Sequence, residues 1–396
     1  MRVRVGCALA GMLASTLASS AWAQPGQPDA ACGSTVPAAM GGPMPAKDQP
    51  VIVLRWLSTS NFELVYRGQV FLLDAYFERG PRNRPTGIVP SEVKKTDAIF
   101  IGHAHFDHIS DVGPIAQATK AKVFGAPITI ETAYKLGVPE GQGSAVSGGE
   151  TLQFPGVTVD AALAQHSTLS MDVLATLGKL YDLDAGPATP EQAAAEKAIL
   201  AKGTFAPDVI TKGTIAHAFT FDTGFKMLWL DSAGPVTDGD RALAQKLGPV
   251  DLAIIAYQGH PVAQVQVPVT LALVKLFKPG TFIPAHHDQI FGTFVDLGVE
   301  PLFEAIAEEL PGTQNDCTAA PARDVLQHSE VTGGNDYDAS SRPRGTGLAL
   351  HQHRFAALDR DIAWEQDEGD LPRSHQRDAD HHRKARAGRR HSSARS

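Results

Sequence analysis

The chain has 396 residues, with 43% hydrophobic and 20% charged side chains and a formal net charge of −8 at pH 7. This composition is typical of a globular chain that buries a large core, and it excludes bulk disorder. The negative charge argues against nucleic acid as a partner, so we expect a small-molecule substrate. The length allows two or three domains, of which we expect one main domain with a tail at each end; the composition indicates no oligomeric state.

The N-terminus has the order of a secretory signal peptide. Arg2 and Arg4 precede an apolar run at positions 5–17, and Ala21-Trp22-Ala23 has the small residues of a cleavage site. We predict that residues 1–23 are removed after Ala23, which takes the formal charge from −8 to −10 because two arginines leave. The apolar run is short for a membrane span, so we expect a periplasmic or secreted protein without stable membrane insertion.

Residues 24–50 are rich in Pro, Gly and Ala and predict a flexible linker, so folding should begin near Val51. From there, strand-like runs alternate with helix-like stretches. The expected strands of this half cover 51–57, 62–66, 70–74, 98–101, 123–125 and 157–163. This alternation predicts an α/β fold, with functional residues just beyond the ends of strands.

Four metal-capable side chains lie within six residues of one another, in His103-Ala104-His105-Phe106-Asp107-His108. Imidazole is the commonest neutral ligand of zinc and carboxylate is a hard anionic one, so His103 and His105 can reach one ion while Asp107 and His108 face a second. Two divalent ions that share a water lower its pKa and stabilise both oxygens of a bond under hydrolysis. A polar surface turn is the alternative, but so dense a cluster rarely arises by chance. The stretch therefore predicts a hydrolytic metal centre.

The pattern HxHxDH resembles the signature of the metallo-beta-lactamase fold superfamily, over a domain that we expect to span 51–315. The resemblance implies a four-layer αββα sandwich of two mixed β-sheets with helices outside. It also implies three further ligands, each after a later strand: His166 after 157–163, Asp231 after 226–230, and His286 in Pro284-Ala285-His286-His287. His287 is the alternative to His286 and would otherwise contact substrate.

The same resemblance implies how the ligands divide between two ions. One ion is expected to bind His103, His105 and His166, and the other Asp107, His108 and His286, with Asp231 as the bridge. Zinc is the expected metal, with iron or manganese as alternatives. Asp107 is the expected catalytic residue, because it would also orient the attacking nucleophile.

Within the superfamily, the chain looks most similar to the branch of ascorbate-6-phosphate lactonase and N-acyl phosphatidylethanolamine phospholipase D. The stretches 55–64 and 71–74 look like their opening hairpin, although Ser58-Thr59 replaces a frequent Gly-His pair and Asp74-Ala75 an Asp-Pro pair. Asp74 is expected beneath the site as a carboxylate that orients a ligand histidine, with a strand-end cap as the alternative.

The second half of the domain predicts a hairpin of strands 214–221 and 226–230 joined at Asp222-Thr223-Gly224-Phe225, then strand 252–256 and helix 267–277. Tyr257 and His260 follow a strand and would serve in the cleft as substrate or proton-transfer groups. His217 lies inside an apolar strand and is expected to be a core histidine.

Residues 167–213 form an insertion that the metal site does not need. Thr189-Pro190-Glu191-Gln192 has the residues of a capping box and predicts a helix that runs to Lys202. Because the insertion leaves directly from His166, we expect a lid that selects substrate; a surface helix without function is the alternative.

Two cysteines remain after signal removal, Cys32 and Cys317, and they either pair or stay as free thiols. Residues 316–396 are expected to form a disordered tail, since Arg, His and Asp follow one another there without periodicity. The composition after Arg342 also fits a shifted reading frame.

The resemblance and the ligand pattern together imply an exported hydrolase of ester, lactone, amide or phosphodiester bonds. A true beta-lactamase is an alternative, although superfamily members that open beta-lactams generally lack the bridging carboxylate expected at Asp231. A flavodiiron-like or other iron redox protein on the same fold is another, although such relatives usually add a flavodoxin module, and no such domain fits this sequence.

Overall fold

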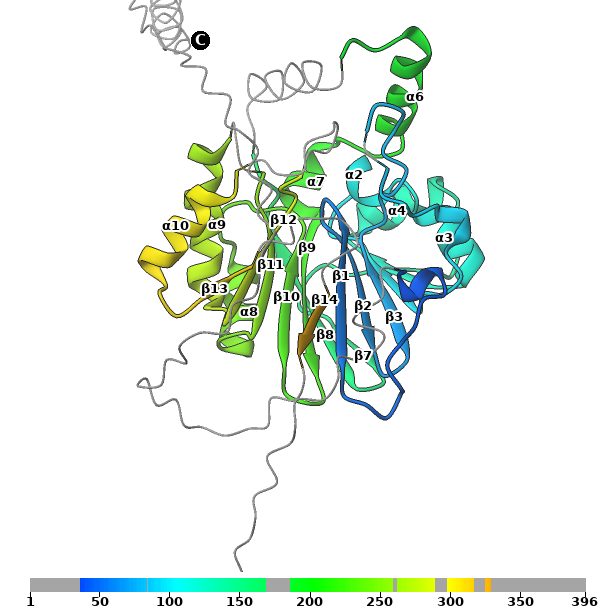
Figure 1. The fold of residues 1–396 in the computed structure, drawn as a ribbon. Helices are drawn as coiled ribbons and strands as arrows, with labels where there is room; N and C mark the ends of the chain where they lie inside the picture. Colours follow the sequence, from blue (N-terminus) through cyan, green and yellow to red (C-terminus); the bar gives the residue numbers. More distant parts are fainter. Residues whose placement is uncertain are drawn as a thin grey trace, which may run out of the picture. The chain divides into compact units, whose positions relative to one another are not determined.

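The computed structural model describes residues 36–83, 85–168, 186–258, 262–288, 298–316 and 325–328, all of which lie in the first of two units, Met1–Gly333 (Figure 1). The expected signal peptide, Cys32, Cys317 and His260 lie outside these residues. Among the helices described, none combines the length and apolar character that a membrane crossing needs.

Within the described residues, the strands form two seven-stranded mixed sheets. The first has the order β14-β1-β2-β3-β4-β5-β6, antiparallel from β14 to β3 and parallel from β3 to β6. Its strands are β1 (Ile52–Ser58), β2 (Asn61–Tyr66), β3 (Gln69–Leu73), β4 (Ala98–Phe100), β5 (Lys122–Gly125), β6 (Gly143–Ala145) and β14 (Val325–His328).

The second sheet has the order β13-β12-β11-β10-β9-β8-β7, antiparallel from β7 to β10 and parallel from β10 to β13. Its strands are β7 (Thr151–Phe154), β8 (Val157–Ala164), β9 (Thr214–Phe221), β10 (Lys226–Leu230), β11 (Leu252–Ala256), β12 (Thr281–Ala285) and β13 (Gln314–Asn315). The hairpin of β9 and β10 was expected at these bounds, and Gly224 in its turn has a φ of 89° that glycine adopts without strain.

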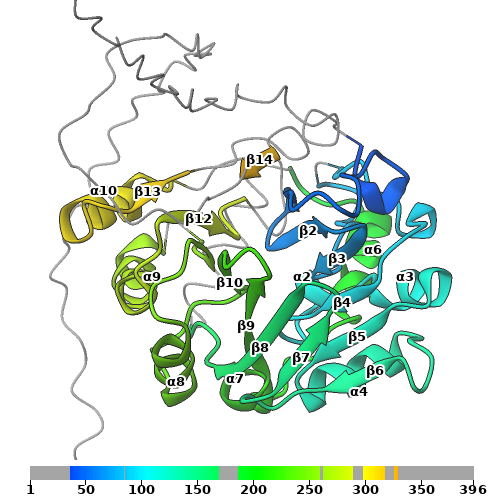
Figure 2. The same ribbon diagram turned by 90° about the horizontal axis from the view of Figure 1, so that it is seen from below.

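Helices cover the outer faces of both sheets (Figures 1 and 2). The α-helices are α2 (Phe106–Ile109), α3 (Val112–Thr119), α4 (Pro127–Lys135), α6 (Pro190–Leu200), α7 (Pro207–Lys212), α8 (Asp238–Leu247), α9 (Ala263–Phe277) and α10 (Glu300–Glu309), and the 3₁₀ turns are η1 (Ala38–Met40) and η2 (Pro90–Glu92). The expected αββα sandwich is therefore confirmed.

Among the described residues, three large apolar clusters hold these layers together, beside a small fourth one of Ala126, Val146, Ala161 and Ile215. The central cluster lies between the sheets, where the rings of Phe100 and Phe219 meet edge to face at 5.2 Å. A second joins the first sheet to α3 and α4, and a third joins the second sheet to α8, α9 and α10. Because residues along a strand point alternately to opposite faces, each sheet contributes to two clusters, which explains why most residues of the central strands are buried, whereas β6, β7 and β13 have none that are buried.

The N-terminal arm differs from the flexible linker expected at 24–50. Its described part, residues 36–50, includes η1, and Ala38 and Ala39 are buried in the cluster beneath the first sheet. The carboxylate of Glu63 accepts hydrogen bonds from the backbone nitrogens of Ala38 (3.1 Å) and Ala39 (2.6 Å) and pairs with Arg55. Composition did not reveal this packing, because the acceptor lies 24 residues further along the chain.

One described stretch of the tail that was expected to be disordered is a strand. Residues 325–328 form β14, which pairs antiparallel with β1, with Ile52 opposite His328. This pairing covers the outer edge of β1, which would otherwise expose unpaired backbone groups.

Candidate metal centre

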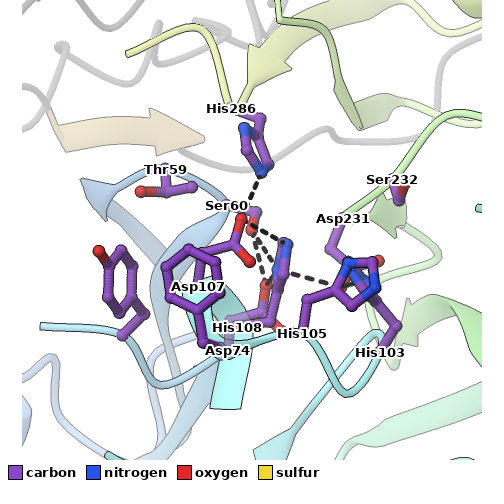
Figure 3. Close-up of polar contacts among 12 residues, drawn as sticks. Thr59, Ser60, Asp74, His103, His105, Asp107, His108, Asp231, Ser232 and His286 are labelled. Carbon is purple, nitrogen blue, oxygen red and sulfur yellow. Dashed lines mark hydrogen bonds and ion pairs between the residues drawn. The ribbon is translucent and has the colours of Figure 1, made fainter. Parts of the chain in front are cut away.

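The expected ligands follow the ends of four strands. His103, His105, Asp107 and His108 come after β4, the last two within α2, and His166, Asp231 and His286 come after β8, β10 and β12. Figure 3 shows the side chains of Asp107, His108, His286, Asp231 and His103 directed toward one another from both sheets.

Among the described residues, three overlapping groups have ligand atoms within 4.8 Å of one another. They are His103 with His105 and His166, Asp107 with His108 and His286, and His103 with His108 and Asp231. The first two sets are those that the sequence assigned to separate ions, and the third joins them through Asp231. The structure thus assembles all seven expected ligands, and their binding of metal stays a prediction.

Asp231 lies between the two sets and is fully buried. Its Oδ2 is 2.7 Å from Nδ1 of His103 and 3.2 Å from Nδ1 of His108, whereas its Oδ1 has no hydrogen-bond partner. A buried carboxylate oxygen without a partner is costly unless something else satisfies it. This oxygen is therefore available to a cation.

Gly102 leaves room for the side chain of Asp231. A Cβ atom on Gly102 would lie 2.0 Å from Cγ of Asp231, so only glycine leaves room for this carboxylate. Gly102 was not among the residues expected to matter. The signal available in the sequence was a glycine directly before the first candidate ligand, His103.

Asp107 lies between two histidines of the second set. Its Oδ2 is 3.1 Å from Nε2 of His286 and 3.4 Å from Nε2 of His108 (Figure 3). Because α2 begins at Phe106, Asp107 and His108 are fixed in its first turn and both are buried.

Asp74 lies beneath His108, where the sequence placed it. Its Oδ2 is 2.6 Å from Nδ1 of His108 and accepts a hydrogen bond from the Ser60 hydroxyl at 2.7 Å, and its Oδ1 accepts one from the backbone of Gly102 at 3.1 Å. A carboxylate on one ring nitrogen orients the imidazole and leaves the other nitrogen for a ligand. Ser60 was not expected here, and nothing in its local sequence indicates this contact.

The structure distinguishes the two adjacent histidines after β12. His286 has a φ of 65°, its backbone nitrogen donates to the carbonyl of Thr59 at 2.9 Å, and its Nε2 faces Asp107. His287 instead stacks on Trp56 at 4.7 Å between ring centroids and is fully buried. The ring of His286 therefore faces Asp107, which favours His286 as the ligand. His287 lies in the packing behind it.

Burial and mutual repulsion keep three histidines neutral. Burial lowers the pKa of His103 well below its ordinary value, and the neighbouring His108 lowers it further. Burial also lowers the pKa of His105, and burial together with His105 lowers the pKa of His166 to about 4. Neutral imidazole is the form that binds metal, so this set needs no deprotonation before binding.

Opposite charges dominate the second set. Burial alone would lower the pKa of His108, but Asp107 and Asp74 raise it well above its ordinary value. Burial likewise opposes ionisation of Asp107, but His108 and His286 hold its pKa well below the usual range. Burial raises the pKa of Asp74 to about 7. A cation at Nε2 of His108 would take the place of a proton beside Asp107, while Asp74 keeps its contact with Nδ1.

Tyr257 and His217, for which the sequence also gave expectations, both lie in the protein interior. Tyr257 lies in the cluster between the second sheet and its helices, so its expected role in the cleft is wrong. The alternation along β11 explains this, since Ala253, Ile255 and Tyr257 share the helix-covered face. His217 is a core histidine as expected, but neither of its ring nitrogens has a hydrogen-bond partner.

Comparison with known proteins finds similarity over much of the chain. A family model described as "Beta-lactamase superfamily domain" matches residues 69–179. A UPF0173 metal-dependent hydrolase of Myxococcus xanthus is 27% identical over 249 residues, which are 62% of this chain and 70% of that protein. One of Cupriavidus necator is 25% identical over 269 residues, 65% of this chain and 83% of that protein. Other relatives with the same description match over about half of their length.

Among solved structures, Igni18, described as a novel metallo hydrolase from Ignicoccus hospitalis, aligns with a TM-score of 0.47 at 17% identity. The alignment covers 71% of this chain and 99% of that one.

Proposed function

We propose that the chain is a member of the metallo-beta-lactamase fold superfamily and a metal-dependent hydrolase whose centre holds two divalent ions. The observation that carries this proposal is the pair of ligand sets joined by Asp231, whose Oδ1 is buried and has no partner. The relatives from Myxococcus xanthus and Cupriavidus necator, both described as metal-dependent hydrolases, support it.

The residues present fit such a centre. His103, His105 and His166 would hold the first ion, Asp107, His108 and His286 the second, and Asp231 both. When bound, two such ions lower the pKa of a water between them and polarise the bond under attack. Asp107, which contacts Nε2 of His108, would also orient the attacking nucleophile, and Asp74 fixes the ring of His108 through Nδ1.

Zinc is the metal that we propose, since five imidazoles and two carboxylates suit it. Iron and manganese accept the same donors, and an iron centre would favour the redox alternative. Metal analysis of the purified protein together with an absorption spectrum distinguishes these metals.

We further propose that the protein is exported and acts on an ester, lactone, amide or phosphodiester of a small molecule. Edman sequencing of the periplasmic protein tests export, and the expected first residue is Gln24. A true beta-lactamase is the second candidate, and nitrocefin hydrolysis tests it directly.

The central experiment assays the mature protein against chromogenic esters, lactones, amides and phosphodiesters, with and without a chelator. We expect hydrolysis of at least one class that the chelator abolishes and added metal restores. Asp107→Ala should abolish turnover, whereas Asp208→Ala, which changes an exposed aspartate on α7, should leave it unchanged. Full activity of the Asp107 variant would reject this assignment.

A further inference from the structure

The segment 186–213 is attached to two of the loops that carry the proposed ligands. The backbone nitrogen of Thr204 donates to the carbonyl of Ala104, between His103 and His105, at 2.9 Å. The backbone nitrogen of His166 donates to the carbonyl of Ile210 at 3.3 Å. Because both contacts use backbone atoms, they fix the course of this segment beside the metal centre.

Side chains strengthen the attachment. Arg82 donates two hydrogen bonds of 2.7 Å to the carboxylate of Glu196 on α6 and one of 2.6 Å to the carbonyl of Gly186. A Cβ atom on Gly203 would lie 2.2 Å from the backbone nitrogen of Phe106, so the segment packs directly against the start of α2. The lid expected from the sequence is thus a docked element over its described part, while residues 169–185 lie outside the described residues.

This docking places one aromatic side chain beside the metal centre. Phe205 stacks on the ring of His105 at 4.9 Å between centroids and lies 6.2 Å from that of Phe106. It is nevertheless 61% exposed, the largest fraction among the exposed large hydrophobic residues described. A single exposed hydrophobic residue is ordinary on a protein surface, but this one covers one face of the ring of His105, a proposed ligand.

We propose that Phe205 is a specificity-determining residue that contacts an apolar part of the substrate, an acyl chain or an aromatic ring next to the bond that is cleaved. The inference rests on the proposed function, which supplies the kind of bond that is cleaved. The contact itself depends only on the stacking on His105 and on the exposed face of the ring. Burying that face against an apolar group would gain free energy that a short polar substrate cannot supply.

Two measurements test the proposal, one of turnover and one of binding without metal. The first compares kcat/KM for p-nitrophenyl hexanoate and p-nitrophenyl acetate, and the second compares calorimetric affinities of the chelator-treated protein for hexanamide and acetamide. The variants are Phe205→Ala and Phe205→Leu. Tyr134→Ala is the matched control, because Tyr134 is an aromatic residue that is 39% exposed on α4.

We expect Phe205→Ala to reduce the preference for the six-carbon ligand roughly tenfold in both measurements, with Phe205→Leu intermediate and Tyr134→Ala unchanged. An equal effect on both chain lengths, or none, would overturn the inference while leaving the proposed function intact if hydrolysis persists. Loss of hexanamide preference in the variant, without hydrolysis of any ester by the wild type, would instead support the inference and count against ester hydrolysis.

Discussion

Replacing Gly102 by alanine should displace the carboxylate that joins the two ligand sets. The added Cβ would lie 2.0 Å from Cγ of Asp231 and 2.1 and 2.2 Å from its two oxygens. Carbon atoms in contact are usually about 3.5 Å apart, so the carboxylate has to move by more than about 1 Å.

The backbone at Gly102 cannot easily retreat instead. Its nitrogen donates to Oδ1 of Asp74, and its carbonyl accepts from the nitrogen of Ile215 at 2.9 Å. Gly102 has no positive φ, so alanine is compatible with the local conformation and by itself would stabilise the fold by about 0.4–1 kcal/mol. The expected damage is therefore concentrated on Asp231 and on its 2.7 Å contact with His103.

We expect Gly102→Ala to weaken metal binding about 10–100-fold, as loss of an orienting contact does elsewhere, and to lower kcat by about 100-fold, as a 1 Å misplacement can. Metal content and competition with a chromophoric chelator measure the first effect, and the best substrate of the panel measures the second. Gly312→Ala is the matched control, because no heavy atom lies within 4 Å of its added Cβ. Two bound ions with wild-type affinity in the Gly102 variant would refute the steric reasoning.

Three further predictions concern other buried ionisable groups. Burial lowers the pKa of His217 from 6.5 to about 4. Between these two pH values the unfolded chain binds a proton that the folded protein does not, so the free energy of unfolding falls with falling pH, by up to about 3 kcal/mol. His217→Phe should remove that share of the pH dependence in urea unfolding between pH 7 and pH 4; an unchanged slope would contradict the prediction. Asp74→Asn should reduce metal affinity about 10–100-fold because His108 loses its orienting charge, and a titration that shows less than a twofold change would count against it. Glu63→Gln removes the charge that pairs with the buried Arg55 and should lower the free energy of unfolding by about 3–5 kcal/mol, measured by denaturant titration; unaltered stability would contradict this prediction.

Much of the candidate centre was predictable because ligand spacing is a local property. His103, His105, Asp107 and His108 are brought together by six residues of chain, and the apolar runs before His166, Asp231 and His286 indicate strands by their own periodicity. The bounds of β9, β10 and β11 were expected for the same reason. The prediction for Tyr257 was wrong because its position after a strand does not indicate on which face of the sheet its side chain lies.

Contacts between distant segments had no such signal. The packing of Ala38 and Ala39 on Glu63 and the pairing of β14 with β1 reversed the expectations of a flexible linker and a disordered tail at those residues. Composition reports the average tendency of a segment to bury surface, whereas these segments are held by particular acceptors and strand edges elsewhere.

The sequence by itself determined which residues are the candidate ligands, because these side chains and the strands that precede them lie in short stretches of chain. Only the tertiary structure placed His286 against Asp107 and His287 against Trp56, brought Asp231 against Gly102 across 129 positions, and placed Phe205 over His105. The reason is that each of these outcomes depends on the relative placement of segments from both sheets and the insertion, which local periodicity does not encode.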